Sequence, residues 1–270
     1  MKAKNLSGVC EKIDFKKIQW YAMRAKLAYT SADQIKKTLK GIKYIKSLDG
    51  IDVQYFVEMS PDNTQLVSVR GTDNFKNIKE DADFVKAKDE RLDIYVHSGF
   101  DKDAMSVYKD LLPRLDKALP VLLTGHSLGA AIATLLMMYL HHDGFVINDS
   151  INFGQPKVTN KEGVAKYDFL PLLRIVDQDD LVPLVPPENL LDLRHGVYEH
   201  LGKELILLRD QYYVLLSEKR AEAVSITDFW KNIGKESITD HYMDNYLLSI
   251  KDKLNQATSV DYGERHQYDQ

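Results

Sequence analysis

The feature that most constrains the fold is the stretch from 121 to 140, VLLTGHSLGAAIATLLMMYL, which contains no aspartate, glutamate, lysine or arginine. Its apolar start predicts a buried strand, and its longer apolar second half predicts a helix. Between them stands Gly-His-Ser-Leu-Gly, which is typical of a tight turn with a serine in strained backbone geometry. Glycines two residues to either side of the serine let the strand and the helix approach without Cβ clashes. The sequence therefore predicts a nucleophile elbow, with Ser127 at its apex and at the N-terminus of a helix.

The same region is long enough to be weighed as a membrane span. Residues 118–140 lack Asp, Glu, Lys and Arg, and an apolar helix of that length can cross a bilayer. Pro120, Gly125 and Gly129 interrupt the segment and divide it into a strand and a helix. We therefore predict an internal strand and helix of a globular domain here.

Composition limits the other classes of protein. A chain of 270 residues, 44% of them hydrophobic, can bury one large core, so we predict a single domain over 1–270, with 258–270 as a polar, flexible tail. The net charge of −4 gives no basic field, which argues against a nucleic-acid partner. The one cysteine, Cys10, allows no intramolecular disulfide and no thiolate-rich zinc site, and no secretory signal is visible. We therefore expect a cytoplasmic location.

Strand and helix patterns alternate along the chain. Asp49-Gly50 lies between two apolar strand patterns, at 42–48 and 51–59, and predicts a β-hairpin. Further strands are predicted at 65–70, 82–88, 94–96, 146–153 and 172–176, with late hairpin strands between 198 and 216. Helices are predicted at 14–40, 100–115, 160–167, 226–233 and 242–254. Parallel strands need helical crossovers, and these helices supply them. The predicted fold class is α/β, with a mostly parallel central sheet and helices on both faces.

A serine nucleophile needs a base to take its proton and a carboxylate to orient that base. In α/β-hydrolases the order along the chain is Ser, then Asp or Glu, then His. The acidic, proline-rich loop that follows the strand at 172–176 offers three candidate carboxylates: Asp177, Asp179 and Asp180. Four histidines lie beyond the helix that follows Ser127: His195, His200, His241 and His266. Spacing alone leaves these alternatives open.

Several short motifs recur together and in a fixed order. They are Arg70-Gly71-Thr72, His97-Ser98-Gly99-Phe100, Gly125-His126-Ser127-Leu128-Gly129-Ala130, Phe153-Gly154-Gln155-Pro156-Lys157-Val158, Arg174-Ile175-Val176, Asp180-Leu181-Val182-Pro183 and Asp240-His241. As an ordered set they resemble the class 3 lipase family, also called fungal lipase-like, of the α/β-hydrolase superfamily. The resemblance extends over residues 15–255.

The resemblance implies a role for each matching position. It makes Ser127 the nucleophile, Asp180 the acid and His241 the base, and it makes Thr72 and Leu128 the oxyanion-hole residues. The order of residues agrees, because Thr72 ends a predicted strand and Leu128 supplies the N–H just after the nucleophile. The hydroxyl of Thr72 is a further candidate donor.

Other residues could also serve as the acid or the base, and two adjacent histidines could suggest a metal site. Asp177 and Asp179 flank the chosen acid, and His200 is the rival base, although its position predicts a strand. His126 is expected to serve in packing or hydrogen bonding. The adjacent His141 and His142 cannot converge on one ion and no His-Glu-x-x-His occurs, so we expect no metal and no cofactor.

The implied function is hydrolysis of carboxylic esters, with acylglycerols or similar lipid esters as substrates and an acyl-enzyme on Ser127. A phospholipase A1, an esterase for short soluble esters and a catalytically inactive binding module remain alternatives. Fungal members carry an apolar lid helix after the oxyanion residue. The matching stretch here, 73–81, has only Phe75 and Ile78 as large apolar residues, which predicts weak activation at lipid surfaces. Transient contact with a membrane or lipid droplet is allowed, and the oligomeric state is left open.

Overall fold

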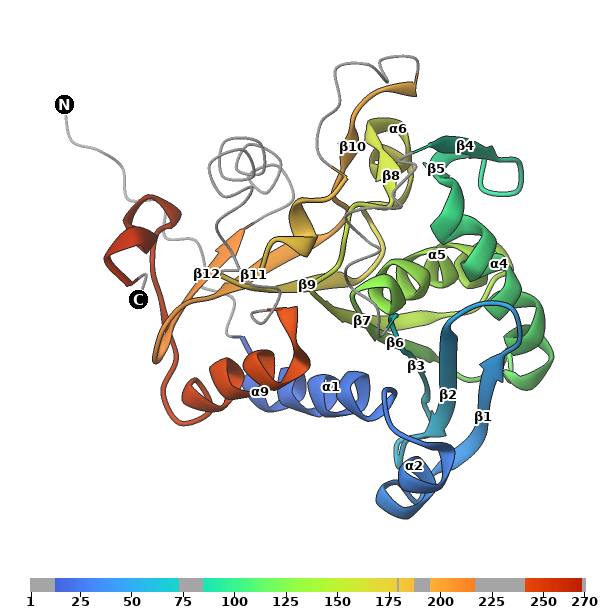
Figure 1. The fold of residues 1–270 in the computed structure, drawn as a ribbon, viewed down its shortest axis with the longest axis horizontal. Coiled ribbons are helices and arrows are strands. Elements are labelled where there is room, and N and C mark those ends of the chain that lie inside the picture. Colours follow the sequence, from blue (N-terminus) through green and yellow to red (C-terminus); the bar gives the residue numbers. More distant parts are fainter. Residues whose placement is uncertain (1–12, 73–84, 179, 187–194, 217–240, 269–270) are drawn as a thin grey trace.

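A nine-stranded sheet runs through the centre of the protein in the computed structural model, which describes residues 13–72, 85–178, 180–186, 195–216 and 241–268 (Figure 1). Its strand order is β1-β2-β3-β6-β7-β9-β11-β12-β13. The strands are β1 (Ile42–Leu48), β2 (Val53–Met59), β3 (Gln65–Val69), β6 (Val121–His126), β7 (Ile147–Phe153), β9 (Leu172–Asp177), β11 (Lys203–Leu207), β12 (Tyr212–Leu216) and β13 (Thr258–Ser259).

The middle of this sheet is parallel, as the sequence predicts. β3, β6, β7, β9 and β11 pair in parallel one after another, and β12 pairs in parallel with β13. The antiparallel pairs are β1 with β2, β2 with β3 and β11 with β12. In the first hairpin Gly50 has a φ of 85°, which glycine adopts at no steric cost. The α/β-hydrolase fold class is thus confirmed.

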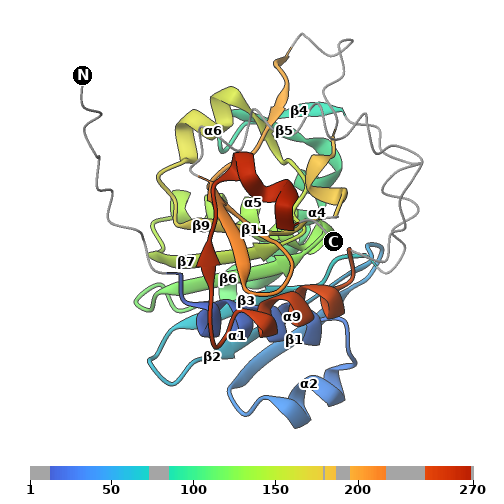
Figure 2. The same cartoon turned by 90° about the vertical axis from the view of Figure 1, so that its left-hand side faces the viewer.

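Helices cover both faces of the sheet. α1 (Phe15–Leu27) and α9 (Met243–Asp252) lie side by side on one face, whereas α4 (Ser98–Leu111), α5 (Leu128–His142) and α6 (Lys161–Tyr167) lie on the other (Figures 1 and 2). α2 (Ala32–Thr38) packs beside β1. The described residues also include the 3₁₀ segments η1 (Leu112–Arg114), η2 (Val182–Leu184) and η5 (Tyr262–Tyr268).

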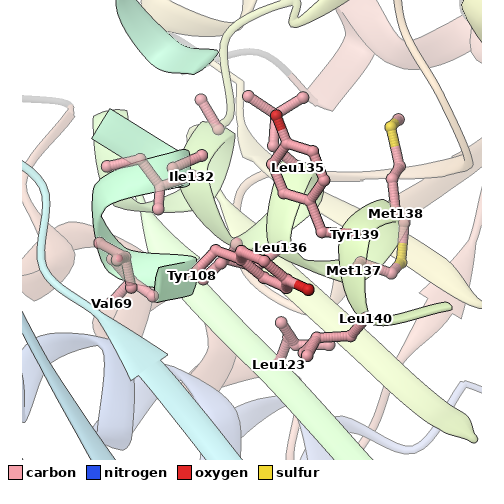
Figure 3. Packing of buried hydrophobic residues seen from close by; sticks show 14 of the residues in the cluster. Val69, Tyr108, Leu123, Ile132, Leu135, Leu136, Met137, Met138, Tyr139 and Leu140 are labelled. Carbon is pink, nitrogen blue, oxygen red and sulfur yellow. The ribbon is translucent and has the colours of Figure 1, made fainter. Parts of the chain in front are cut away.

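Two hydrophobic cores result, one on each face. Because side chains alternate along a strand, Leu122 of β6 packs toward α1 and α9, and its neighbour Leu123 packs toward α4 and α5. α5 lies between the sheet and other helices, and Figure 3 shows its leucines and methionines packed on several sides. Complete burial explains why this helix carries no charged face. Within the described residues no helix has both the length and the apolar character of a membrane span.

Two features differ from the sequence prediction. A second, four-stranded sheet has the order β10-β8-β5-β4, and the sequence does not predict it as a separate sheet. Three of its strands, β4 (Lys86–Asp89), β5 (Ile94–His97) and β10 (Tyr198–Glu199), overlap predicted strands, whereas β8 (Thr159–Asn160) is not predicted. Residues 258–268, expected as a tail, instead form β13 and η5, and Val260, Tyr262 and Tyr268 pack against strands β11 and β12. Such sparse apolar residues give no periodic signal, although they are enough to cover the end of a sheet. The helix expected at 226–233 lies outside the described residues.

Candidate active site

Ser127 lies at the turn between β6 and α5. Its backbone angles are φ 59° and ψ −129°, an unusual conformation for a residue with a side chain. A Cβ on Gly125 would lie 2.2 Å from the carbonyl oxygen of Gly129, and one on Gly129 would lie 2.3 Å from that of Val69. Both glycines are therefore needed for strand and helix to approach this closely, and the turn has the geometry of the predicted elbow.

The predicted oxyanion-hole residues border this serine. Leu128 is the first residue of α5, so its N–H belongs to the helix N-terminus, where backbone donors have no acceptor within the helix. A Cβ on Gly71 would lie 3.1 Å from Cβ of Ser127, which places the segment that ends in Thr72 beside the nucleophile. The Thr72 hydroxyl donates to Asp52 Oδ2 at 3.0 Å. A contribution from Thr72 to an oxyanion would therefore come from its backbone N–H.

Asp180 and His241 meet at the carboxyl end of the parallel strands. Asp180 follows β9, and His241 lies two residues before the first residue of α9. His241 Nδ1 lies 2.7 Å from Asp180 Oδ2, and both side chains are buried. The Tyr246 hydroxyl donates to the same oxygen at 2.5 Å, and the Val182 backbone N–H donates to Asp180 Oδ1 at 2.9 Å. Three donors therefore converge on one carboxylate.

This environment fixes the charge of Asp180. Burial alone would raise the pKa of the carboxyl, but the neighbouring His241 and the hydrogen bonds from His241, Tyr246 and Val182 outweigh it and hold the pKa of Asp180 below its ordinary value. Burial beside a carboxylate raises the pKa of Tyr246 well above its usual range, so this tyrosine keeps its proton. Asp180 is a carboxylate at neutral pH and can hold His241 with its proton on Nδ1.

Gly154 makes room for this pair. It follows β7 with a φ of 52°, and a Cβ there would lie 2.7 Å from both Asp180 Oδ2 and His241 Cε1. The preceding residue, Phe153, accepts a hydrogen bond from the Ser127 N–H at 3.0 Å. The serine and the Asp–His pair thus lie on either side of one short backbone segment.

No hydrogen bond joins the Ser127 hydroxyl to the His241 ring within the described part of the structure. Ser127 Oγ is buried and has no hydrogen-bond partner among the described residues. Catalytic hydrogen bonds of unliganded enzymes are often long and tighten only when substrate binds, so the arrangement is compatible with proton transfer from serine to histidine.

The rival candidates are engaged elsewhere. His200 Nε2 lies 2.6 Å from the Pro183 carbonyl oxygen, and burial, followed by nearby cations, lowers the pKa of His200 well below its usual value. Asp177 ends β9 and accepts a hydrogen bond from Ser249 at 3.0 Å. Asp179, Asp240 and the lid stretch at 73–81 lie outside the described residues. The described part of the chain contains no group of three or more His, Cys, Asp or Glu side chains that could hold a metal.

The structure also shows residues that the sequence analysis does not single out. Tyr246 lies on α9 and reaches Asp180, and Tyr29 follows α1 and meets His126 at 2.8 Å. Both contacts join segments far apart in sequence. The only available sequence signal is the position of Tyr246 on the helix that His241 precedes.

The sheet order and the serine elbow define the fold of this protein as the α/β-hydrolase fold. The family model described as "Lipase (class 3)" matches residues 66–190, which contain Ser127 and Asp180. This match confirms the class 3 lipase resemblance that the ordered motifs indicate.

Individual relatives agree. The chain is 33% identical over 141 residues to "Secreted mono- and diacylglycerol lipase 1" of Fusarium solani, which covers 45% of this chain and 39% of that protein. It is 28% identical over 160 residues to a lipase of Rhizopus oryzae, and the match covers 53% of this chain and 40% of that protein. The chain thus matches about two fifths of the length of these curated relatives.

Solved structures support the fold over a larger part of the chain. Lipase II from Rhizopus niveus superposes with a TM-score of 0.66 at 23% identity, covering 85% of this chain and 94% of that one. Lip2 lipase from Yarrowia lipolytica gives a TM-score of 0.67 at 18% identity, covering 85% and 93%. At such identities the likeness concerns the fold.

Proposed function

We propose that this protein is a serine hydrolase of carboxylic esters, with lipid esters as its substrates. The observation that carries the proposal is the buried, charged Asp180 bonded to His241 Nδ1 at 2.7 Å, beside a serine at a strand-to-helix elbow. A carboxylate that fixes the tautomer of a histidine next to a nucleophilic serine is the arrangement that acyl transfer needs.

Each group then has one role. Ser127 Oγ attacks the ester carbonyl carbon while His241 Nε2 takes the serine proton. The negative oxygen that forms is stabilised by the N–H of Leu128, at the N-terminus of α5, and by the N–H of Thr72. His241 returns its proton to the departing alcohol, which leaves an acyl-enzyme on Ser127. Water then attacks the acyl carbon while His241 takes one of its protons. His241 returns that proton to Ser127 Oγ as the bond from Oγ to the acyl carbon breaks, which releases the carboxylic acid and the free serine.

Substrate class is the part of the proposal that the relatives' names support. Those names specify lipases, and one specifies mono- and diacylglycerols. Acylglycerols or similar lipid esters are therefore the proposed substrates, and a phospholipase A1 or a short-chain esterase shares the same mechanism. Contact with a membrane or lipid droplet would be transient. Location remains a prediction, since a single cysteine fits the cytoplasm and one relative is named as secreted.

A hydrolysis profile tests the proposal. p-Nitrophenyl esters of increasing acyl length, together with a phospholipid, are offered to the wild-type protein and to Ser127→Ala. We expect hydrolysis by the wild type, with short to medium acyl chains preferred, and a loss of several powers of ten in the alanine variant. Equal rates for the two proteins, or no hydrolysis of any ester by folded wild type, would contradict it.

The lid prediction has its own measurement. The rate on tributyrin is followed through the solubility limit of the substrate. Because Phe75 and Ile78 are the only large apolar residues of the stretch 73–81, we expect activity below that limit and no sharp jump above it. A flat line followed by a steep rise would mean that a functional lid closes the site.

A further inference from the structure

His126 is a buried histidine that the proposed mechanism does not use. It ends β6, directly before Ser127, and its side chain is only 1% exposed. Its Nε2 lies 2.7 Å from the backbone carbonyl oxygen of His241, and its Nδ1 lies 2.8 Å from the hydroxyl of Tyr29. The rings of His126 and His241 have centroids 4.4 Å apart. His126 therefore connects the strand that carries the nucleophile to the backbone of the proposed base.

The partners determine where the proton of His126 lies. A backbone carbonyl only accepts, so Nε2 must carry the hydrogen. In a neutral ring Nδ1 is then an acceptor, and the Tyr29 hydroxyl is its donor. Tyr29 is itself held by its neighbours, because Gln54 Nε2 donates to the carbonyls of Ala28 and Thr30, both at 2.8 Å.

His126 also stays neutral. Burial is the main cause that lowers the pKa of His126 well below its ordinary value, and the neighbouring His241 lowers it further. A neutral ring matters at this point, because His241 becomes positively charged during acyl transfer and a second cation next to it would oppose that charge.

We propose that His126 is a positioning residue for the reaction: its Nε2–H holds the His241 backbone carbonyl and so fixes the distance between the base and Ser127. This inference rests on the proposed function of the same site. The His241 side chain is already fixed at Nδ1 by Asp180, and the contact with His126 fixes its backbone. Two separate anchors thus determine where Nε2 of His241 meets the serine.

The expected effect follows from geometry. Misplacement of a catalytic group by about 1 Å can cost on the order of a hundredfold in rate. Loss of the His126 anchor should therefore lower kcat and leave KM nearly unchanged, since no atom of His126 contacts the substrate in the proposed mechanism.

Two amide substitutions separate the two sides of the ring. The amide nitrogen of glutamine reaches the position of Nε2, whereas that of asparagine reaches only the position of Nδ1. His126→Gln keeps a donor to the His241 carbonyl, and His126→Asn does not. We expect kcat of His126→Gln to lie within about threefold of wild type and kcat of His126→Asn to fall by about 10- to 100-fold.

Two controls accompany these variants. Active sites are counted with a fluorophosphonate, so that kcat refers to folded protein. Leu136→Ala, a change in the buried face of α5, reports whether destabilisation alone lowers kcat. Retention of kcat in Leu136→Ala and its loss in His126→Asn would support a positioning role.

A spectroscopic measurement is independent of turnover. The downfield proton of His241 Nδ1–H bonded to Asp180 is followed by NMR in wild type and in both variants. We expect the resonance to persist in His126→Gln and to shift or broaden in His126→Asn. Equal kcat and equal spectra for the two variants, in a preparation whose wild type is active, would overturn the inference. An inactive wild type with this spectroscopic contrast would instead overturn the proposed function alone.

Discussion

The two ends of α5 each contain a buried acidic site, and the two sites treat their carboxylates in opposite ways. Near the first residue of the helix, Asp180 accepts from three donors, namely His241, Tyr246 and the N–H of Val182. Near its last turns, one tyrosine hydroxyl, that of Tyr139, lies between two carboxylates, Asp89 and Asp101. Asp180 therefore has three hydrogen-bond donors to itself. Asp89 and Asp101 compete for the single hydroxyl proton of Tyr139.

As a consequence, the pKa values of Asp180 and Asp101 are shifted in opposite directions. The donors around Asp180 overcome its burial and lower the pKa of that carboxyl. Burial raises the pKa of Asp101 to about 6, Tyr139 opposes this, and the charge of Asp89 adds to it. A buried carboxylate thus stays charged where donors surround it, as they surround Asp180 in the proposed active site.

The largest expected difference between the two sites is in turnover, when the charge of either carboxylate is removed. Asp180→Asn should lower turnover about 10⁴-fold, because the asparagine amide favours the wrong tautomer of His241. Asp101→Asn, at the other end of α5, should leave turnover unchanged. Turnover of p-nitrophenyl butyrate per fluorophosphonate-labelled site measures both. Normal turnover in Asp180→Asn together with loss of turnover in Asp177→Asn would show that Asp177 is the acid and that the assignment to Asp180 is wrong.

Removal of one donor from Asp180 should give the next largest effect. Tyr246→Phe deletes a buried hydrogen bond to a charged group and should lower the free energy of unfolding by about 2 kcal/mol at pH 7. The pKa of Asp180 is depressed in the folded protein, so this stabilisation is present above the ordinary pKa of an aspartate and is lost as the pH falls through the folded value. Urea unfolding measured from pH 7 down through the acid range, as far as the protein stays folded, tests it. A difference between Tyr246→Phe and wild type that does not shrink as the pH falls would argue against the charged hydrogen bond.

The opposite sign is expected for Asp101→Asn. The folded-state pKa of Asp101 is raised from 3.8 to about 6, so the wild type loses stability as the pH rises across that window, and the cost persists above it. The variant should be more stable by about 1 kcal/mol at pH 8 and equal to wild type near pH 4. Partial exposure and the nearby N-terminus of α4 keep the gain this small. A variant less stable than wild type at pH 8 would contradict the raised pKa of Asp101.

An exposed ion pair supplies the smallest effect. Lys26 of α1 pairs with Asp244 of α9, and their side chains are 45% and 74% exposed. Lys26→Ala should change the free energy of unfolding by less than about 0.5 kcal/mol, and less still in high salt. Urea unfolding at low and high salt measures it. A change in the free energy of unfolding above 1 kcal/mol would mean that this exposed ion pair stabilises the protein as much as a buried charge does. Burial would then not explain the larger effects expected at Asp180 and Asp101.

Local signals made much of the fold predictable. The strand and helix that flank Ser127 follow from one apolar stretch and two glycines, and the first hairpin follows from Asp49-Gly50. The second sheet was predicted only in part: strand patterns mark β4, β5 and β10, whereas a strand as short as Thr159–Asn160 carries no periodicity. β13 and η5 depend on a few apolar side chains that gain contacts only after β12 is in place.

The site was predictable to the extent that residue order could specify it. Asp177 and Asp180 are equivalent by local spacing, and only the resemblance favoured the second. The structure separates them, because the chain turns after β9, so that Asp177 faces Ser249 and Asp180 faces His241. Tyr246 and the link through His126 were out of reach, since each joins segments more than sixty residues apart.

The central claim is that Ser127 is a nucleophile activated by His241 and Asp180, and covalent labelling tests it most directly. The folded protein is treated with a fluorophosphonate, digested, and examined by mass spectrometry for the modified residue. We predict one adduct, on Ser127, that forms rapidly in wild type and far more slowly in His241→Ala and Asp180→Asn. No adduct on Ser127 in folded wild type, or equal labelling rates in all three proteins, would contradict the account.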